Sequence, residues 1–172
     1  MMTVMHRYSF LIFILFSTLT MAQQTTPKSA FLEKWDNSRD YILAIAASMP
    51  EESFSFKPMP REMSFMEQLV HIGENIDWIS SKYFDAQKRS DSDLKSDKER
   101  TIANLTMSFK HSRIAIENTD ESDLKDVVGF FAGPKSKLQL LNLLQDHVTH
   151  HRGQLIVYLN LKEIDPPSYV GW

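Results

Sequence analysis

Hydrophobic residues recur at every third or fourth position in several long stretches of this chain, which is the period of an amphipathic helix. The clearest stretch begins at Ser64, because Ser64-Phe-Met-Glu67 has the spacing of a capping box. In that motif a hydroxyl and a carboxylate each bind a backbone amide that the helix leaves free. The apolar stripe that follows consists of Phe65, Leu69, Ile72, Ile76, Ile79 and Tyr83. We predict a helix over this stretch.

Three other stretches have the same helical pattern. Pro50, Pro58 and Pro60 separate the first of them from the capping-box helix, since proline lacks an amide donor and biases its predecessor toward extended geometry. The last stretch stops before Pro166-Pro167. We predict these three helices over about Lys28 to Ser48, Glu99 to Glu117 and Ser136 to Leu161.

Two longer connections join the helices. Residues Gln87 to Lys98 are rich in serine, aspartate and lysine, so we expect a solvated segment. Residues Thr119 to Lys135 include the apolar portion Val127 to Pro134, which we expect to fold back over one end of the bundle. No stretch has a convincing strand pattern. The sequence therefore predicts an all-α fold, a four-helix bundle with two crossover connections.

The first 22 residues have the pattern of a secretory signal. His6 and Arg7 precede an apolar run from Tyr8 to Leu19, and the small side chains of Thr20 and Ala22 suit a signal peptidase. The run is short for a membrane span, which takes about 20 residues. We expect cleavage after Ala22 and a single domain over residues 23–172. The alternative is an uncleaved amino-terminal anchor.

The amino-acid composition excludes several classes of partner and of active site. The predicted signal carries Arg7 and no acid, so the remaining chain has 18 basic and 22 acidic side chains. We therefore expect no nucleic-acid partner, because such partners favour a strong basic excess. After the predicted signal, no segment is apolar enough to span a membrane. The chain has no cysteine, which excludes disulfides, thiolate ligands and a cysteine nucleophile.

Histidines supply the candidate chemistry. His147 and His151 are four residues apart, so their rings lie above one another on one face of the last predicted helix. They border its apolar stripe and should face the bundle interior. His71 lies at the polar edge of its own helix, beside Asn75. Burying such a ring is costly unless both nitrogens are satisfied, which a metal ion and a hydrogen-bond acceptor would achieve.

Each histidine also has a simpler interpretation. A pair four residues apart occurs on helices that bind no metal, and His71 alone could be a satisfied core residue or an exposed one. His150 falls away from the stripe and is interpreted as a surface residue or a support for the ligands. His111 lies opposite the apolar stripe of its helix and is interpreted as a surface residue. Asp146 is a weak candidate for supporting the ligands, as is Asn75.

Other metal and catalytic motifs are absent from the sequence. A zincin needs a glutamate directly after its first histidine, whereas Val148 follows His147. A di-iron bundle needs Glu-x-x-His, but Glu67 precedes His71 by four positions. No glycine-rich phosphate loop or serine elbow is present either.

Two blocks of sequence resemble the DinB-like superfamily. One is the run His147-Val-Thr-His-His-Arg-Gly-Gln154 followed by Tyr158-Leu159, and the other is Phe54-x-Phe-x-Pro58 followed by Ser64 to Ile72. The resemblance covers about Phe31 to Tyr169. It implies an up-down-down-up bundle, often dimeric, with a metal triad that maps onto His71, His147 and His151.

The resemblance is less specific about activity. Relatives include thiol-dependent transferases and an isomerase that depends on mycothiol, and these thiols are cytoplasmic molecules. An exported chain would not meet them.

Three neutral imidazoles leave a coordination position open, which is typical of a catalytic site. Zn²⁺ or Ni²⁺ would suit nitrogen ligands. We therefore hypothesise a metal-dependent hydrolase or transferase that acts on a small molecule in the periplasm or outside the cell. The alternatives are a bundle that binds metal or a partner protein without catalysis, and a bundle without metal.

Arg152 and Gln154 could position substrate or support the bundle, and helical geometry favours a structural role for Arg152. Trp78 and Tyr158 lie near the ligand face, either lining a pocket or packing in the core.

Overall fold

Four helices form the body of the computed structural model, which describes residues 25–88 and 98–172. The predicted signal and most of the first crossover connection lie outside these residues. The helices are α2 (Pro27–Ser48), α3 (Phe65–Tyr83), α4 (Lys98–Asn118) and α5 (Lys137–Leu161). Two short 3₁₀ helices, η1 (Glu51–Ser53) and η2 (Glu121–Lys125), lie in the connections. The four predicted helices are confirmed, with ends that differ by about one residue.

Hydroxyl side chains start three of the helices. The capping box predicted at Ser64 is confirmed: its Oγ accepts from the Glu67 amide at 3.2 Å, and the Glu67 carboxylate accepts from the Ser64 amide at 2.6 Å. Thr26 caps α2 in the same way, and so does Ser136 at the start of α5. These caps satisfy amides that have no partner within the helix, which is why the helices begin at these residues.

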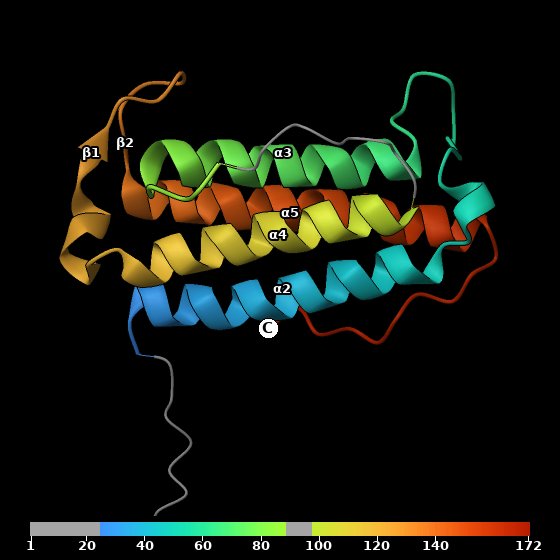
Figure 1. The fold of residues 1–172 in the computed structure, drawn as a ribbon, viewed down its shortest axis with the longest axis horizontal. Coiled ribbons are helices and arrows are strands. Elements are labelled where there is room, and N and C mark those ends of the chain that lie inside the picture. Colours follow the sequence, from blue (N-terminus) through green and yellow to red (C-terminus); the bar gives the residue numbers. More distant parts are fainter. Residues whose placement is uncertain (1–24, 89–97) are drawn as a thin grey trace, which may run out of the picture.

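The helices are arranged as an up-down-down-up bundle (Figure 1). Helices α2 and α5 run in one direction, and α3 and α4 run in the other. The main packing partners of α3 are α4 and α5, and these two also pack on α2. Helices α3 and α5 are therefore antiparallel neighbours, which places residues near position 71 beside residues near position 150.

Two lysines cap helices across the bundle. The Lys28 ammonium, at the start of α2, donates to the carbonyls of Glu117 and Thr119 at the end of α4 (3.2 and 2.7 Å). The Lys98 ammonium, at the start of α4, donates to the carbonyls of Ala47 and Met49 at the end of α2 (both 2.7 Å). Cations at helix carboxyl ends satisfy free carbonyls and complement the helix dipole. Each helix of this antiparallel pair thus caps the other.

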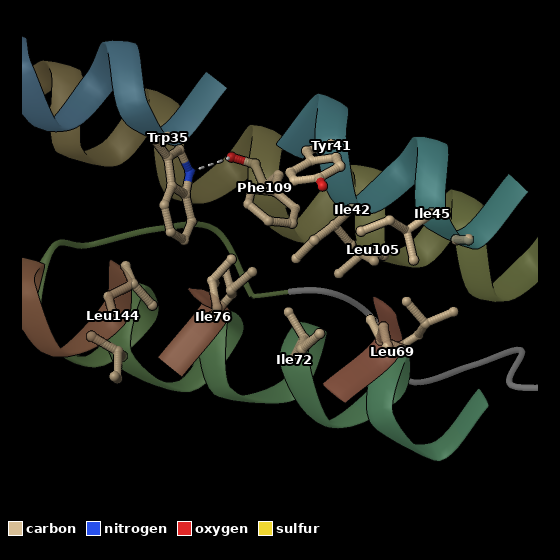
Figure 2. Packing of buried hydrophobic residues seen from close by; sticks show 14 of the residues in the cluster. Trp35, Tyr41, Ile42, Ile45, Leu69, Ile72, Ile76, Leu105, Phe109 and Leu144 are labelled. Carbon is tan, nitrogen blue, oxygen red and sulfur yellow. Dashed lines mark hydrogen bonds between the residues drawn. The ribbon is translucent and has the colours of Figure 1, made fainter. Parts of the chain in front are cut away.

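The core lies between all four helices. Figure 2 shows Leu69, Ile72 and Ile76 of α3 pointing toward the side chains of α2 and α4. Trp35 is buried with its indole N–H directed at the Phe109 carbonyl (3.4 Å), so the polar atom of this large side chain is satisfied. The apolar stripe of α3 predicted from the sequence is buried along its whole length. This packing fixes the rotation of α3 and hence the direction of its polar edge.

The second crossover contains a small hairpin that the sequence did not predict. Strand β1 (Val127–Val128) pairs antiparallel with β2 (Lys135–Ser136). Gly133 lies in the turn with φ of 92°, a conformation that favours glycine. Strands of two residues are too short to produce an alternating pattern. As expected, the segment folds at the end of the bundle, where Phe130 packs on α3, although Phe131 stays exposed.

The carboxyl-terminal residues return along α2. The Tyr169 ring lies 6.0 Å from the Tyr41 ring, and the Trp172 carbonyl accepts from the Asn37 amide at 2.6 Å. The indole of Trp172 itself stays exposed. Among the described residues, no helix has the length and hydropathy needed to cross a bilayer.

Candidate metal centre

The side chains of His71, His147 and His151 meet between α3 and α5. One ligand atom from each lies within 4.8 Å of the others. The Nε2 atoms of His71 and His147 are 3.1 Å apart, and the three ring centroids are separated by 4.5 to 4.9 Å. His151 is buried, whereas His71 and His147 are partly buried. In the part of the chain that the structure describes, these residues form the one cluster of this kind.

Helix geometry explains the convergence. His147 and His151 are one turn apart on α5, so both rings point to the same side. The buried stripe of α3 turns His71 toward the seam with α5 because α3 and α5 pack as antiparallel neighbours. Two helices that are far apart in sequence thus bring three imidazoles to one point.

Two glutamines fix the orientation of the His151 ring. Its Nδ1–H donates to Oε1 of Gln68 and to Oε1 of Gln154, the latter at 3.0 Å. Gln68 also donates from Nε2 to the Tyr158 hydroxyl at 3.5 Å, and that hydroxyl donates to the Met63 carbonyl at 2.8 Å. With Nδ1 engaged, Nε2 of His151 is the ring nitrogen left free for a metal ion. Such support by a hydrogen-bond acceptor is typical of histidine ligands.

Gln68 is a site residue that the sequence reasoning missed. It is buried, and it lies one turn before His71 on the side that faces α5. A polar residue between the buried Phe65 and Leu69 of the apolar stripe is the signal that could have identified it.

Burial keeps His147 and His151 neutral. Together with repulsion from charge on His151, His71 and His150, it lowers the pKa of His147 from 6.5 to about 4. Burial also lowers the pKa of His151 to about 4, with added repulsion from His71 and His150 and a smaller opposite effect of the Gln154 hydrogen bond. At neutral pH both rings are uncharged, which is the form that binds a metal ion.

The spacing fits a small nitrogen-binding cation. Zinc–nitrogen bonds of about 2.0–2.1 Å in tetrahedral geometry place two ligand atoms about 3.3 Å apart. The 3.1 Å between Nε2 of His71 and Nε2 of His147 is close to this separation. The other pairs of ligand atoms lie within 4.8 Å, so a bound ion would require side-chain rotation that brings them closer. His147 Nδ1 is buried and has no hydrogen-bond partner among the described residues, so its satisfaction requires such a rotation or a water molecule.

The other candidate residues lie around or outside this cluster. His150 is exposed, as predicted, with its ring centroid 4.9 Å from that of His151. Asp146 is exposed too, whereas the Asn75 Oδ1 atom is buried without a hydrogen-bond partner in the described part of the chain. The buried Arg152 lies over the Tyr41 ring at 5.2 Å, which confirms the structural role favoured for it.

His111 departs from its prediction as a surface residue. It is partly buried and lines a cavity of about 470 Å³ between the ends of α3, α4 and η2. Its Nδ1 atom is buried and lacks a partner among residues 25–88 and 98–172. The segment after α3 covers this side of α4, which the periodicity of α4 alone could not reveal. His111 is not part of the histidine cluster.

A second cavity of about 470 Å³ adjoins His71. It lies between α3 and the segment before it, on the flank of α3 that also carries Val70 and Glu74. Met63 and Met66 contribute apolar walls. The histidine cluster is therefore bordered by a space of the size that small-molecule sites have.

Comparison with known proteins identifies the family of this chain and supports its fold. The model of the DinB family matches residues 21–167. No curated protein matches the chain. A DinB-like protein from Bacillus cereus ATCC 10987 is 20% identical with a TM-score of 0.72, and the match covers 81% of this chain and 95% of that one. A DinB-like protein from Bacillus subtilis is 17% identical with a TM-score of 0.68, covering 81% and 96% of the two chains. At these identities the structures support the fold alone.

Proposed function

The chain belongs to the DinB family, and from this premise we propose that it is an exported metal-dependent hydrolase or transferase that acts on a small molecule. His71, His147 and His151 hold one divalent ion, with zinc or nickel preferred by the nitrogen donors. The observation that carries the proposal is the convergence of three imidazoles, neutral at least in His147 and His151, beside a cavity.

The chain's own residues prepare the site for this chemistry. Gln68 and Gln154 hold His151 in the tautomer that leaves Nε2 free. The side chain of His71 lines a cavity on one flank of the cluster. Three protein ligands leave a tetrahedral ion with one open position. When bound there, the ion supplies a Lewis acid that can acidify water or a thiol or polarise a carbonyl.

The remaining parts of the proposal concern location and assembly. The signal-like pattern of residues 1–22 supports export to the periplasm or beyond the cell, where cytoplasmic thiols are absent. Resemblance to the family supports a homodimer. We include neither a nucleic-acid partner nor a membrane partner for the domain that follows the signal.

Metal analysis of protein purified from its native compartment tests the site. We expect roughly one zinc or nickel ion per chain in the wild type and only trace metal in the His147→Ala/His151→Ala variant, because one imidazole cannot hold the ion alone. His150→Ala, which removes an exposed neighbour, should keep the full content. Equal metal in the wild type and the double variant would rule out the three-histidine site.

The visible spectrum of the cobalt-substituted protein separates catalysis from mere binding. An open coordination position should take up azide and shift the cobalt bands. A saturated ion in a non-catalytic bundle should give the same spectrum with and without azide.

A further inference from the structure

Four aromatic rings gather where the hairpin meets α3, and we name this cluster the aromatic platform: Trp78, Tyr83, Phe130 and Phe131. The Trp78 ring lies 5.8 Å from that of Phe130 and 6.1 Å from that of Phe131. The Phe130 and Phe131 rings are 4.3 Å apart. Phe131 is 83% exposed and Trp78 is 38% exposed. The platform thus presents aromatic surface to solvent at one end of α3.

The platform is held in place even though it is exposed. The Tyr83 hydroxyl donates to the Gly129 carbonyl at 3.2 Å, which ties the hairpin to α3. The β1–β2 pairing fixes the base of the hairpin, and the Lys137 amide donates to the Asp126 carbonyl at 2.9 Å. Contiguous exposed apolar surface is unfavourable in water and often marks a binding site. An anchored aromatic surface is suited to that use because little order is lost on binding.

The platform and the histidine cluster share one line along α3. Trp78 follows His71 by seven residues, which is two helical turns, about 10.5 Å along the axis and about 20° from the same direction. Asn75 lies between them, and its buried Oδ1 has no hydrogen-bond partner in the described part of the chain. On α5, Leu143 lies one turn before His147 and is 40% exposed. An unused acceptor and apolar side chains therefore follow the histidines along the α3–α5 seam.

We propose that this seam is the specificity site of the metal centre and that its ligand is a small molecule with a planar apolar group. A metal-binding head that carries an N–H donor binds at the histidines and donates to Asn75 Oδ1. An aryl group about 10 Å from the ion packs on Trp78 and Phe131. This inference rests on the proposed function, because the head needs the metal ion. The substrate class is thus an aryl-bearing amide or acyl compound.

The cavity beside His71 is the competing place for the apolar group. It lies on the flank of α3 that carries Met66 and Val70, about 100–140° around the helix from His71 and away from the α5 seam. An ion pair of 2.8 Å between Lys57 and Glu67 lies at its wall. No unpartnered buried acceptor of the described residues lines this cavity. The matched control variant below comes from this cavity.

Calorimetric titration of the zinc-loaded protein with hydroxamates tests the proposal. Acetohydroxamic acid measures the head alone, and 4-phenylbutanohydroxamic acid adds a ring at the required reach. We expect the phenyl tail to tighten binding about tenfold, the effect of one well-packed aromatic contact with its burial. The cyclohexyl analogue should gain less, since it cannot stack. Equal affinity of the phenyl and cyclohexyl compounds would overturn the planar preference.

Substitutions in the protein show where the phenyl tail of the hydroxamate binds. Trp78→Ala and Phe131→Ala should each remove most of the phenyl gain while leaving acetohydroxamic acid binding unchanged. Because Phe131 is mostly exposed, its variant should fold even if Trp78→Ala does not. Met63→Ala removes an exposed apolar side chain of the competing cavity and should keep the gain. Asn75→Ala should weaken both hydroxamates several-fold. Loss of the gain in Met63→Ala alone would place the tail in the cavity and contradict the proposal.

Two further outcomes separate this inference from the proposed function. Acetohydroxamic acid that binds through the histidines, with no phenyl gain, would overturn the platform and leave the metal site. Metal-free protein whose Trp78 indole NMR signal shifts with 4-phenylbutanamide, but which binds no zinc, would support the platform and refute the proposed function. If Phe131→Ala instead alters vesicle binding or the oligomeric state while the gain persists, the platform serves another partner and the proposal is wrong.

Discussion

At the scale of single residues, the position of one proton organises the histidine cluster. The Nδ1–H of His151 is committed to the side-chain oxygens of Gln68 and Gln154, so its Nε2 has no proton and is the nitrogen left free for a metal ion. Gln68 is itself held by the Tyr158 hydroxyl. A short chain of hydrogen bonds thus sets the tautomer before any ligand arrives.

We predict that Gln68→Ala weakens zinc affinity by about 10–100-fold, because the His151 ring loses the acceptor that orients it. Competition with a chromophoric chelator measures the affinity. Gln145→Ala is the matched control: this buried glutamine of α5 donates to Ser38 at 2.9 Å and does not touch the histidines. Unchanged affinity in Gln68→Ala would mean that the hydrogen bond plays no part in metal binding.

Acid should destabilise the metal-free protein through the same residues. The pKa of His147 and that of His151 are both lowered from 6.5 to about 4 in the folded state. Between these values the unfolded chain binds more protons, so stability is present above about pH 6.5 and is lost as the pH falls to about 4. Urea unfolding in the presence of a chelator should show this loss. The slope should be smaller in His147→Ala/His151→Ala, and an equal slope would contradict the prediction.

The residue scale also separates what the sequence could predict from what it could not. The spacing of His147 and His151 predicts that they share a face, because helical geometry alone decides it. The role of Gln68 depends on how α3 and α5 pack, and no spacing within one helix contains that information. His111 was misjudged for the same reason, since a neighbouring segment covers it.

At the scale of elements, helix boundaries were predictable and the hairpin was not. Ser64 and Ser136 mark helix starts through local hydrogen bonds, so a few residues of sequence suffice. The strands β1 and β2 are two residues each and have no periodicity to detect. Their pairing depends on the Gly133 turn and on the ring contacts of Phe130 with α3. A short element of this kind is defined by its contacts.

Lys98 provides a test of the caps between helices. We predict that Lys98→Met lowers the free energy of unfolding by about 1 kcal/mol, because two carbonyls at the end of α2 lose a charged donor. Chemical denaturation measures the change. Lys110→Met, which replaces an exposed lysine of α4, should change stability by less than about 0.5 kcal/mol. Equal effects of the two substitutions would assign the loss to charge alone.

At the scale of the whole molecule, the histidines join α3 to α5 across 76 residues of sequence. The chain has no disulfide that could do this, so the proposed ion would be its one coordinate link between distant segments in the described part. The up-down-down-up order came from the family resemblance and is confirmed by the structure. Periodicity predicts how many helices form but not their directions, which depend on the paths of the connections.

Zinc should therefore stabilise the entire fold. A ligand at 100 times its dissociation constant adds about 2.7 kcal/mol to the free energy of unfolding, provided that the unfolded chain does not bind it. We expect thermal midpoints to rise with zinc in the wild type and to stay constant in His147→Ala/His151→Ala. Magnesium should have no effect on either, because it prefers oxygen ligands. An equal zinc response in both proteins would assign the stabilisation to other sites.

Because Lys28 of α2 and Lys98 of α4 each cap the other helix, the lengths of α2 and α4 depend on each other. The two helices have 22 and 21 residues, and each ammonium meets carbonyls at the far end of its neighbour. One residue inserted into the middle of either helix would displace everything beyond it by about 1.5 Å and rotate it by about 100°, which separates one ammonium from its carbonyls. Homologous chains should therefore lengthen or shorten these two helices together, and accept unmatched insertions only in the connections.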